Sequence, residues 1–305
     1  MVDPLTVATE MIRANKVLRS LAGQEIDTIT INSLDAEDAP FLALVISKLS
    51  PMIGNLLERK IIHILDREVD HGMRWVRQDP GFPDALLVDG LGNSAEAGYE
   101  VKAWYALSTE LTGRFRESLN LLAPRNVRVV IVAWCMSHVV YGVPQIIDVM
   151  TVGGAEVASS RDVHYWNPPS YLTVEPGDTT LRTRNLQQTN VNGYRLQDVT
   201  DTQEIEALAL VAERGGRRLL PSSPDAQLLA QQLMANYPYR LDTNFAKIDR
   251  VDNPNIEQFK ADVLNRRMRD KTMKQWVQLL KGLSSERASV REHCEEVMKA
   301  IYDGL

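Results

Sequence analysis

A continuous apolar run, VRVVIVAW at residues 127–134, limits the folds open to this chain more than any other feature of its sequence. Strands that are buried on both faces read as near-continuous runs of Val and Ile, because neither face meets water. Such a strand needs another layer of structure on each side of its sheet. The run therefore predicts a central strand in a sheet that is covered on both faces.

Helical periodicity places further elements around this run. Apolar residues recur with the helical period over residues 4–20 and again over 52–65. Two short strands are expected within 83–104, and helices at about 109–122 and 144–151. Helices that alternate with strands in this way are typical of a mixed α/β core, a mixed β-sheet flanked by helices.

The second half of the chain changes character twice. Residues 152–200 are rich in Pro, Gly, Thr and Asn, which favours several short strands joined by loops. From residue 201 to residue 305 the pattern is largely helical. We therefore expect an α/β core with its N-terminal helices at 1–200 and a mostly helical C-terminal subdomain at 201–305.

The composition is that of an ordinary globular protein, with 44% hydrophobic and 24% charged residues. No apolar run approaches about eighteen residues, so no membrane span is expected. The N-terminus shows no basic segment followed by an apolar one, as a signal peptide would. Cys135 and Cys294 belong to no ligand cluster, which favours a reduced, cytoplasmic protein over a disulfide scaffold or a zinc site.

The net charge of −6 weighs against indiscriminate binding to nucleic acid, which usually accompanies a basic balance. A local basic cleft is compatible with this total. Residues 260–281 contain seven Lys or Arg against two Asp, although a run of this kind is most often a solvated helix face. The sequence has no GxxxxGK[ST] loop, which argues against a nucleotide cofactor.

The stretch PDALLVDGLGNSAEAGYEVKAW, residues 83–104, carries an unusual pair of charges. Glu100 and Lys102 alternate with apolar residues, so both side chains project from one face of a strand. The strand that begins at Asp84 can return beside them as a hairpin. The pair is either a structural ladder pair or part of an active site with Asp84, and its apolar neighbours favour the second interpretation because buried charge is costly.

A cluster of this kind suits phosphodiester hydrolysis, which needs a hard cation held by oxygen ligands and a nucleophilic water beside it. Asp84 and Glu100 would supply carboxylate ligands, and Val101 a carbonyl oxygen. Lys102 would act on the attacking water and on the developing negative charge as a point charge.

Two other aspartates compete with Asp84 for the role of ligand. Asp89 precedes Gly90, a pair that is typical of a turn. Asp79 precedes Pro80 and is interpreted as a bend before the strand. Asp84 is therefore the preferred ligand.

Pro83-Asp84 followed by Glu100-Val101-Lys102 resembles the PD-(D/E)XK motif of the restriction-endonuclease-like nucleases. The resemblance implies a core made of a helix, a three-stranded meander that bears the motif, a helix and a further strand. It also implies Mg²⁺ as the cofactor.

The order of elements over residues 52–135 matches that core. Carried over position by position, Asp84 and Glu100 would be the metal ligands and Lys102 the catalytic lysine. Many members of the superfamily place a glutamate on the helix before the motif, and Glu58 stands at that place.

A polar segment, TLRTRNLQQTNVNGYRLQ at 180–197, is a candidate for reading DNA sequence. Arginine suits guanine, and Asn or Gln suits adenine, in bidentate contacts in the major groove. The alternative is a polar loop with turn-forming asparagines. The candidate base contacts are Arg182, Arg184, Asn185, Gln187, Gln188, Asn190, Asn192 and Arg195, and the candidate phosphate contacts are Arg114, Arg116 and Arg161.

The resemblance is strongest to a type II restriction endonuclease, which would hydrolyse double-stranded DNA at a short specific sequence and leave 5′-phosphate ends. It also implies a homodimer, because a twofold enzyme can cut both strands of a palindromic site. Two alternatives remain. One is a repair or mobile-element nuclease of the same superfamily, and the other is a non-catalytic DNA-binding protein.

Overall fold

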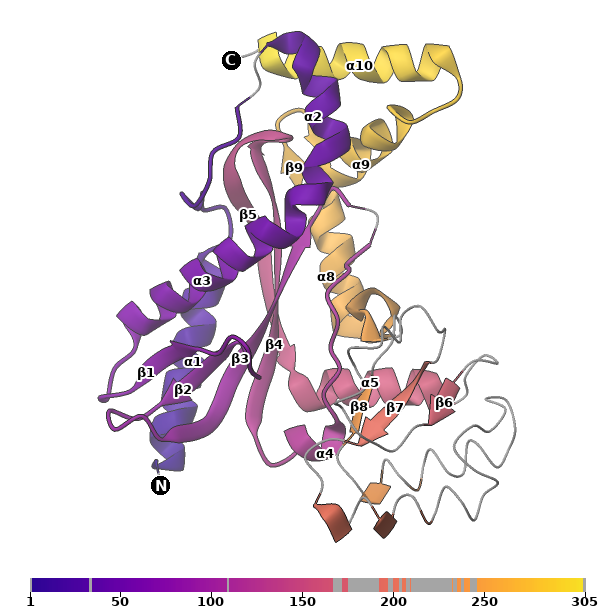
Figure 1. The fold of residues 1–305 in the computed structure, drawn as a ribbon. Coiled ribbons are helices and arrows are strands. Elements are labelled where there is room, and N and C mark those ends of the chain that lie inside the picture. Colours follow the sequence, from indigo (N-terminus) through magenta and orange to yellow (C-terminus); the bar gives the residue numbers. More distant parts are fainter. Residues whose placement is uncertain are drawn as a thin grey trace. The chain divides into compact units, whose positions relative to one another are not determined.

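The computed structural model describes residues 2–32, 35–108, 110–166, 172–174, 192–196, 200–202, 205–206, 209, 232, 235–236, 239–241 and 246–303 (Figure 1). Its elements, with η for a 3₁₀ helix, are α1 (Pro4–Ser20), η1 (Ala36–Asp38), α2 (Ala39–Val45), η2 (Ile46–Leu49), α3 (Ser50–Glu68), β1 (Arg74–Arg77), β2 (Ala85–Val88), β3 (Ser94–Tyr105), α4 (Leu119–Leu122), β4 (Asn126–His138), β5 (Tyr141–Gly153), α5 (Gly154–Trp166), β6 (Leu172–Val174), β7 (Asn192–Leu196), β8 (Tyr239–Leu241), η5 (Ile248–Arg250), α8 (Pro254–Asn265), β9 (Arg267–Met268), β10 (Lys271–Thr272), α9 (Met273–Gly282) and α10 (Ala288–Asp303).

The chain divides into two compact units. Unit 1 comprises Met1–Leu111, Arg128–Val152 and Pro254–Leu305, and unit 2 comprises Thr112–Val127 and Gly153–Asn253. This division differs from the expected boundary between residues 200 and 201, because the chain leaves unit 1 and returns to it twice.

Unit 1 is built on a five-stranded sheet whose neighbouring strands follow chain order, β1-β2-β3-β4-β5 (Figure 1). β2 is antiparallel to both β1 and β3. The central strand predicted from the apolar run is confirmed as β4, in which every residue from Val129 to Met136 is fully buried. A mixed α/β fold with helices beside the sheet is confirmed with it.

Helices α1 and α3 contact the same face of the sheet. The predicted helix 4–20 is confirmed as α1, and the Asp3 side chain caps it by accepting a 3.0 Å hydrogen bond from the Thr6 N–H. The Tyr99 hydroxyl of β3 donates to the Met11 carbonyl of α1 at 3.2 Å. A Cβ on Gly54 of α3 would lie 3.3 Å from the Ala103 Cβ of β3, so this glycine permits close packing of α3 on the sheet.

The opposite face of β3 is covered by α8. Trp104 packs against Phe259 of α8, with ring centroids 6.4 Å apart. Since alternate residues of a strand point to opposite faces, the odd-numbered Tyr99 and Ala103 face α1 and α3, and the even-numbered Trp104 faces α8. Glu100 and Lys102 therefore share the face of Trp104.

The sequence predicts no segment apolar enough to cross a membrane, and the helical stretch Ala36–Glu68 corrects this expectation. By length and composition alone, it is apolar enough to do so. It is the only such stretch among the described residues. In the structure it is divided into η1, α2, η2 and α3, and the apolar side of α3 lies in the core of unit 1 with Ile53, Leu57 and Ile61 fully buried. The first part of the stretch exposes Phe41 instead.

Three predicted elements differ in the structure. Residues 144–151 form part of strand β5 rather than a helix, and within the described residues 110–122 the structure has only the short helix α4. The segment 152–166, where short strands were expected, contains helix α5. In each of these segments, packing against neighbouring elements outweighs the local sequence pattern.

Unit 2 contains α4, α5 and a small three-stranded sheet. In that sheet β7 is parallel to β6 and antiparallel to β8. The core includes Phe115 and Val157, which are buried, and the Phe115 N–H donates to the Ala246 carbonyl at 2.8 Å.

Candidate active site

The β2–β3 hairpin brings Asp84 beside Glu100. The register pairs Ala85 with Tyr99 and Leu86 with Gly98, and one step further along the same register Asp84 lies opposite Glu100. Gly98 is required here, because a Cβ at this position would collide with the Ala85 carbonyl and the Pro83 ring. The hairpin expected from the sequence is therefore confirmed, and a glycine maintains its close approach.

Three hydrogen bonds connect the charged groups of the hairpin. Asp84 Oδ2 accepts from the Val101 N–H at 2.7 Å, and Glu100 Oε2 accepts from the Asp84 N–H at 3.3 Å. Lys102 Nζ donates to Glu100 Oε1 at 2.6 Å. Two carboxylates and one ammonium group are thus held together by the backbone that carries them.

Burial distinguishes this cluster from a surface ladder pair. The side chain of Glu100 is 13% exposed and that of Lys102 is 14% exposed. A solvated cross-strand pair keeps its charges in water and contributes little energy, whereas these charges have lost most of their hydration. Holding them there costs free energy of desolvation, which a solvated structural pair would not incur.

The carboxyl group of Asp84 carries the clearest electrostatic signature in the hairpin. Burial, followed by the neighbouring Glu100 carboxylate, raises its pKa to about 7. Lys102 and the hydrogen bond from Val101 act in the opposite direction, and Glu58 adds to the rise. Negative charge is therefore in excess at this position, and a bound cation would relieve it.

Glu58 lies close enough to raise the pKa of Asp84, but an arginine holds its carboxylate. Arg77 Nε of β1 donates to Glu58 Oε1 at 2.8 Å, and Arg77 Nη1 lies 2.9 Å from Asp79 Oδ2. These two acids raise the pKa of the Arg77 guanidinium. Sequence reasoning missed Arg77, whose only signal is its alternation with Val76 in the strand RWVR.

The described residues contain no group of three or more His, Cys, Asp or Glu side chains placed to hold one metal ion. Glu58 therefore does not complete a set of three carboxylates with Asp84 and Glu100. The candidate ligands are the two carboxylates of the hairpin and the backbone carbonyl of Val101, all of them the hard oxygen donors that Mg²⁺ prefers.

Asp89 has the turn role that its sequence context predicts. Its carboxylate accepts hydrogen bonds from the Leu91 N–H at 2.9 Å and from the Asn93 N–H at 2.8 Å. The Asn93 side chain and backbone lower the pKa of Asp89. Asp89 is committed to closing the loop between β2 and β3, which leaves Asp84 as the better candidate ligand.

The three candidate phosphate contacts lie in unit 2. Arg114 and Arg116 are half-buried and precede the short helix α4 in the sequence. The backbone of Arg114 forms an isolated antiparallel β-bridge with that of Lys247. Arg161 is fully buried, donating from Nη1 to the Phe115 carbonyl at 2.8 Å and from Nε to Asp162 Oδ1 at 3.0 Å. The expectation that Arg161 contacts DNA is therefore wrong, because its guanidinium serves the interior of unit 2.

Most of the candidate base contacts lie outside the described residues: Arg182, Arg184, Asn185, Gln187, Gln188 and Asn190. Asn192 and Arg195 belong to β7, where the backbone of Asn192 pairs with Leu172 and that of Arg195 with Arg240. Part of the segment is thus a strand, whereas its role in reading bases stays a prediction.

Three of the seven cations in the basic run at 260–281 form ion pairs with nearby acids. Arg266 forms a 2.7 Å ion pair with Asp148, and Lys260 forms one of 2.9 Å with Glu257. Lys271 pairs with Asp270. The expected helix face is corrected in part, because Arg266, Arg267, Arg269 and Lys271 lie outside the helices, in and around the β9–β10 hairpin.

The site of this chain thus consists of Asp84, Glu100 and Lys102 on one hairpin, with the Glu58–Arg77 ion pair close by. It combines hard oxygen donors, a half-buried ammonium group and an excess of negative charge. No protein-family model, curated protein or solved structure matches the chain.

Proposed function

We propose that this protein is a Mg²⁺-dependent nuclease with a restriction-endonuclease-like core, and that Asp84, Glu100 and Lys102 form its active site. The observation that carries the proposal is the half-buried cluster on the β2–β3 hairpin, in which Lys102 pairs with Glu100 and the Glu100 carboxylate also accepts from the Asp84 N–H. Such a cluster is costly for the free protein, which is typical of groups retained for binding or catalysis.

The residues present fit a divalent cation. Asp84 and Glu100 carry two negative charges when ionised, and Lys102 compensates only one of them. The carboxylate of Asp84 is the group whose ionisation is most hindered, so a cation beside it would favour the charged form. Bound Mg²⁺ would supply Lewis-acid polarisation of a phosphate oxygen and lower the pKa of a bound water.

The chain's own groups have distinct roles in this proposal. Lys102 orients the attacking water and stabilises the charge that develops on the phosphate, since its ammonium group is already held in place by Glu100 Oε1. Asp84 Oδ2 is fixed by the Val101 N–H, and its second oxygen, Oδ1, would be the atom that holds a cation. Glu58 of α3, which pairs with Arg77 of β1, adds negative charge near Asp84.

The substrate proposed is double-stranded DNA, cut at a short specific sequence to leave 5′-phosphate ends. In this proposal the protein acts as a cytoplasmic homodimer in a restriction system, residues 182–195 read the bases, and Arg114 and Arg116 contact phosphates. Mixed Arg, Asn and Gln side chains in the polar segment support the recognition role, because these residues make bidentate contacts to guanine and adenine.

Incubation of the purified protein with phage DNA and Mg²⁺ tests this function. Discrete fragments are expected, with no cleavage in EDTA and none by the Asp84→Ala or Glu100→Ala variants. Asp89→Ala, whose carboxylate serves the loop, is the matched control and should still cut at the same sites. Random or structure-dependent nicking would indicate a repair or mobile-element nuclease instead, and DNA binding without cleavage under any divalent cation would indicate a non-catalytic protein.

A further inference from the structure

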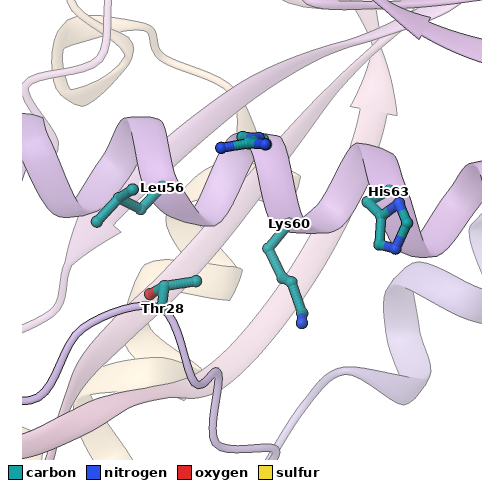
Figure 2. Close-up of a pocket in the computed structure, with 5 residues that line it drawn as sticks. Thr28, Leu56, Lys60 and His63 are labelled. Atoms are coloured by element: carbon teal, nitrogen blue, oxygen red, sulfur yellow. The ribbon is translucent and has the colours of Figure 1, made fainter.

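A second candidate site lies in unit 1, in a cavity of about 350 Å³ beside helix α3 (Figure 2). Its lining residues are Thr28, Leu56, Arg59, Lys60 and His63. Figure 2 shows Lys60 pointing from α3 toward the chain segment that carries Thr28. The volume is at the lower end of the range found for small-molecule sites.

The cavity concentrates positive charge that the protein does not neutralise. The cations Arg59 and Lys60 line it together with His63, and among the described residues no acidic side chain does. Within the described part of the chain, the side chains of these three residues have no ion-pair or hydrogen-bond partner. Other charges of α3 are paired, since Glu58 holds Arg77 and Asp66 holds Arg74. Arg59 is exposed and Lys60 is half-buried, so both cationic groups are accessible to a ligand that enters the cavity.

The cavity is separate from the hairpin site. Leu56, Lys60 and His63 recur at helical spacing on the side of α3 that faces away from its buried residues, such as Ile53 and Ile61. The buried side of α3 packs on the odd-numbered face of β3, whereas Glu100 and Lys102 lie on the even-numbered face. A duplex engaged at the hairpin would have α3 and the sheet between itself and the cavity.

We propose that this cavity binds the phosphate dianion of a small molecule. Such a group carries a charge of about −1.5 to −2 at neutral pH, which Arg59 and Lys60 together balance. A guanidinium binds two phosphate oxygens at once, and an ammonium group adds a point charge. The Thr28 hydroxyl makes only a long 3.5 Å contact with the Ile26 carbonyl, so it is available to the ligand. Leu56 provides an apolar wall for the rest of the molecule.

Calorimetric titration of the full chain with inorganic phosphate, adenosine 5′-monophosphate and adenosine tests the proposal. Lys60→Met should weaken the binding of both phosphate probes about tenfold or more, the effect of one lost charge-assisted hydrogen bond. Arg59→Met should do the same. Lys48→Met, which removes an exposed lysine of η2 outside the cavity, should change nothing. Inorganic phosphate and the nucleotide together distinguish free phosphate from a phosphate monoester.

Three results would overturn the proposal: no binding of either phosphate probe, equal binding of adenosine, or unchanged affinity in Lys60→Met and Arg59→Met. Competition by a short DNA duplex, with loss of duplex binding in Lys60→Met, would also overturn it and assign the cavity to DNA. None of these readouts depends on cleavage, so they are independent of the nuclease proposal. Unchanged thermal unfolding of the variants is the check on folding.

Discussion

Asp84 is the residue whose charge state couples folding to the proposed chemistry. In the unfolded chain its carboxyl group has the ordinary pKa of 3.8, and burial beside Glu100 raises the folded value to about 7. Between these two pH values the folded protein keeps a proton that the unfolded chain has released. The free energy of unfolding should therefore fall as pH rises from about 4 to about 7, and level off above that.

Asp84→Asn removes this dependence. An amide oxygen can still accept from the Val101 N–H and carries no charge, so the variant should be more stable than the wild type at pH 8, on the order of 1–3 kcal/mol. At pH 4 the two proteins should be nearly equal. Urea unfolding at both pH values measures the difference. Asp89→Asn is the control, since the pKa of Asp89 is lowered instead; equal pH dependence in wild type and Asp84→Asn would contradict the burial argument.

Lys102→Ala should reduce cleavage by about 10²–10³-fold or more, because it removes a charge aimed at the developing anion. Binding to cognate DNA should stay nearly intact, since the lysine acts on the water more than on the duplex. Gel-shift and single-turnover assays on the same preparation separate the two effects. Lys48→Ala is the matched control on an exposed lysine. Cleavage by Lys102→Ala at the wild-type rate would remove Lys102 from the mechanism.

Sequence reasoning reached the charged residues of the hairpin but not the ion pair beside them. Asp84, Glu100 and Lys102 are visible as a motif because hairpin partners are close in the sequence. The Glu58–Arg77 pair joins a helix to an edge strand, and its formation depends on packing that no local pattern reports. The prediction for Arg161 was wrong for the same reason, since none of its neighbours in the sequence indicates that its side chain is fully buried.

At the scale of elements, the β2–β3 hairpin depends on one glycine. Gly98→Ala would press a methyl group into the Ala85 carbonyl and the Pro83 ring. We expect a loss of about 1–3 kcal/mol in the free energy of unfolding, together with reduced cleavage, because the strands must separate where Asp84 meets Glu100. Chemical denaturation measures the first effect and a cleavage assay the second.

Gly153→Ala is the matched control for that experiment. A Cβ there would meet nothing closer than 3.6 Å, an ordinary contact, so stability should be nearly unchanged. If Gly98→Ala were as stable and active as Gly153→Ala, the tight approach of the two strands would have no energetic consequence. The register argument for the site would then lose its support.

Segments with a strong sequence pattern were predictable and segments with a weak one were not. The helix at 4–20 keeps the helical period, and the run at 127–134 is apolar at nearly every position, so packing confirms what each pattern indicates. β5 contains Gly142 and Pro144, and its expected helix at 144–151 was inferred from a run too short to separate the helical period from the strand period. Its pairing in the sheet decided the conformation.

At the scale of the whole molecule, the site lies entirely in unit 1, so a cation bound there should stabilise that unit alone. Mg²⁺ at about 100 times its dissociation constant would add about 2.7 kcal/mol. The shift in melting temperature should be larger at pH 8 than at pH 6, because protons on Asp84 compete with the cation.

Differential scanning calorimetry with and without Mg²⁺ measures this stabilisation. Where two transitions are resolved, only one should move, and neither should move in Asp84→Asn or Glu100→Gln. Equal shifts with Mg²⁺ in Asp84→Asn would mean that the cation binds elsewhere. This readout does not require DNA, so it tests the metal site apart from the nuclease activity.

The order in which the chain is synthesised has a consequence for when this site can form. Trp104 is covered by Phe259 of α8, and about 150 residues separate β3 from that helix. At 5–20 residues per second, a ribosome needs roughly 7–30 s to deliver α8 after β3 has emerged. Throughout that interval Trp104 has no covering helix, and β3 exposes apolar surface on the face that also carries Glu100 and Lys102. The hydrogen bonds of the hairpin itself lie within residues 84–102, so the charged cluster can form before α8 arrives to bury this apolar surface.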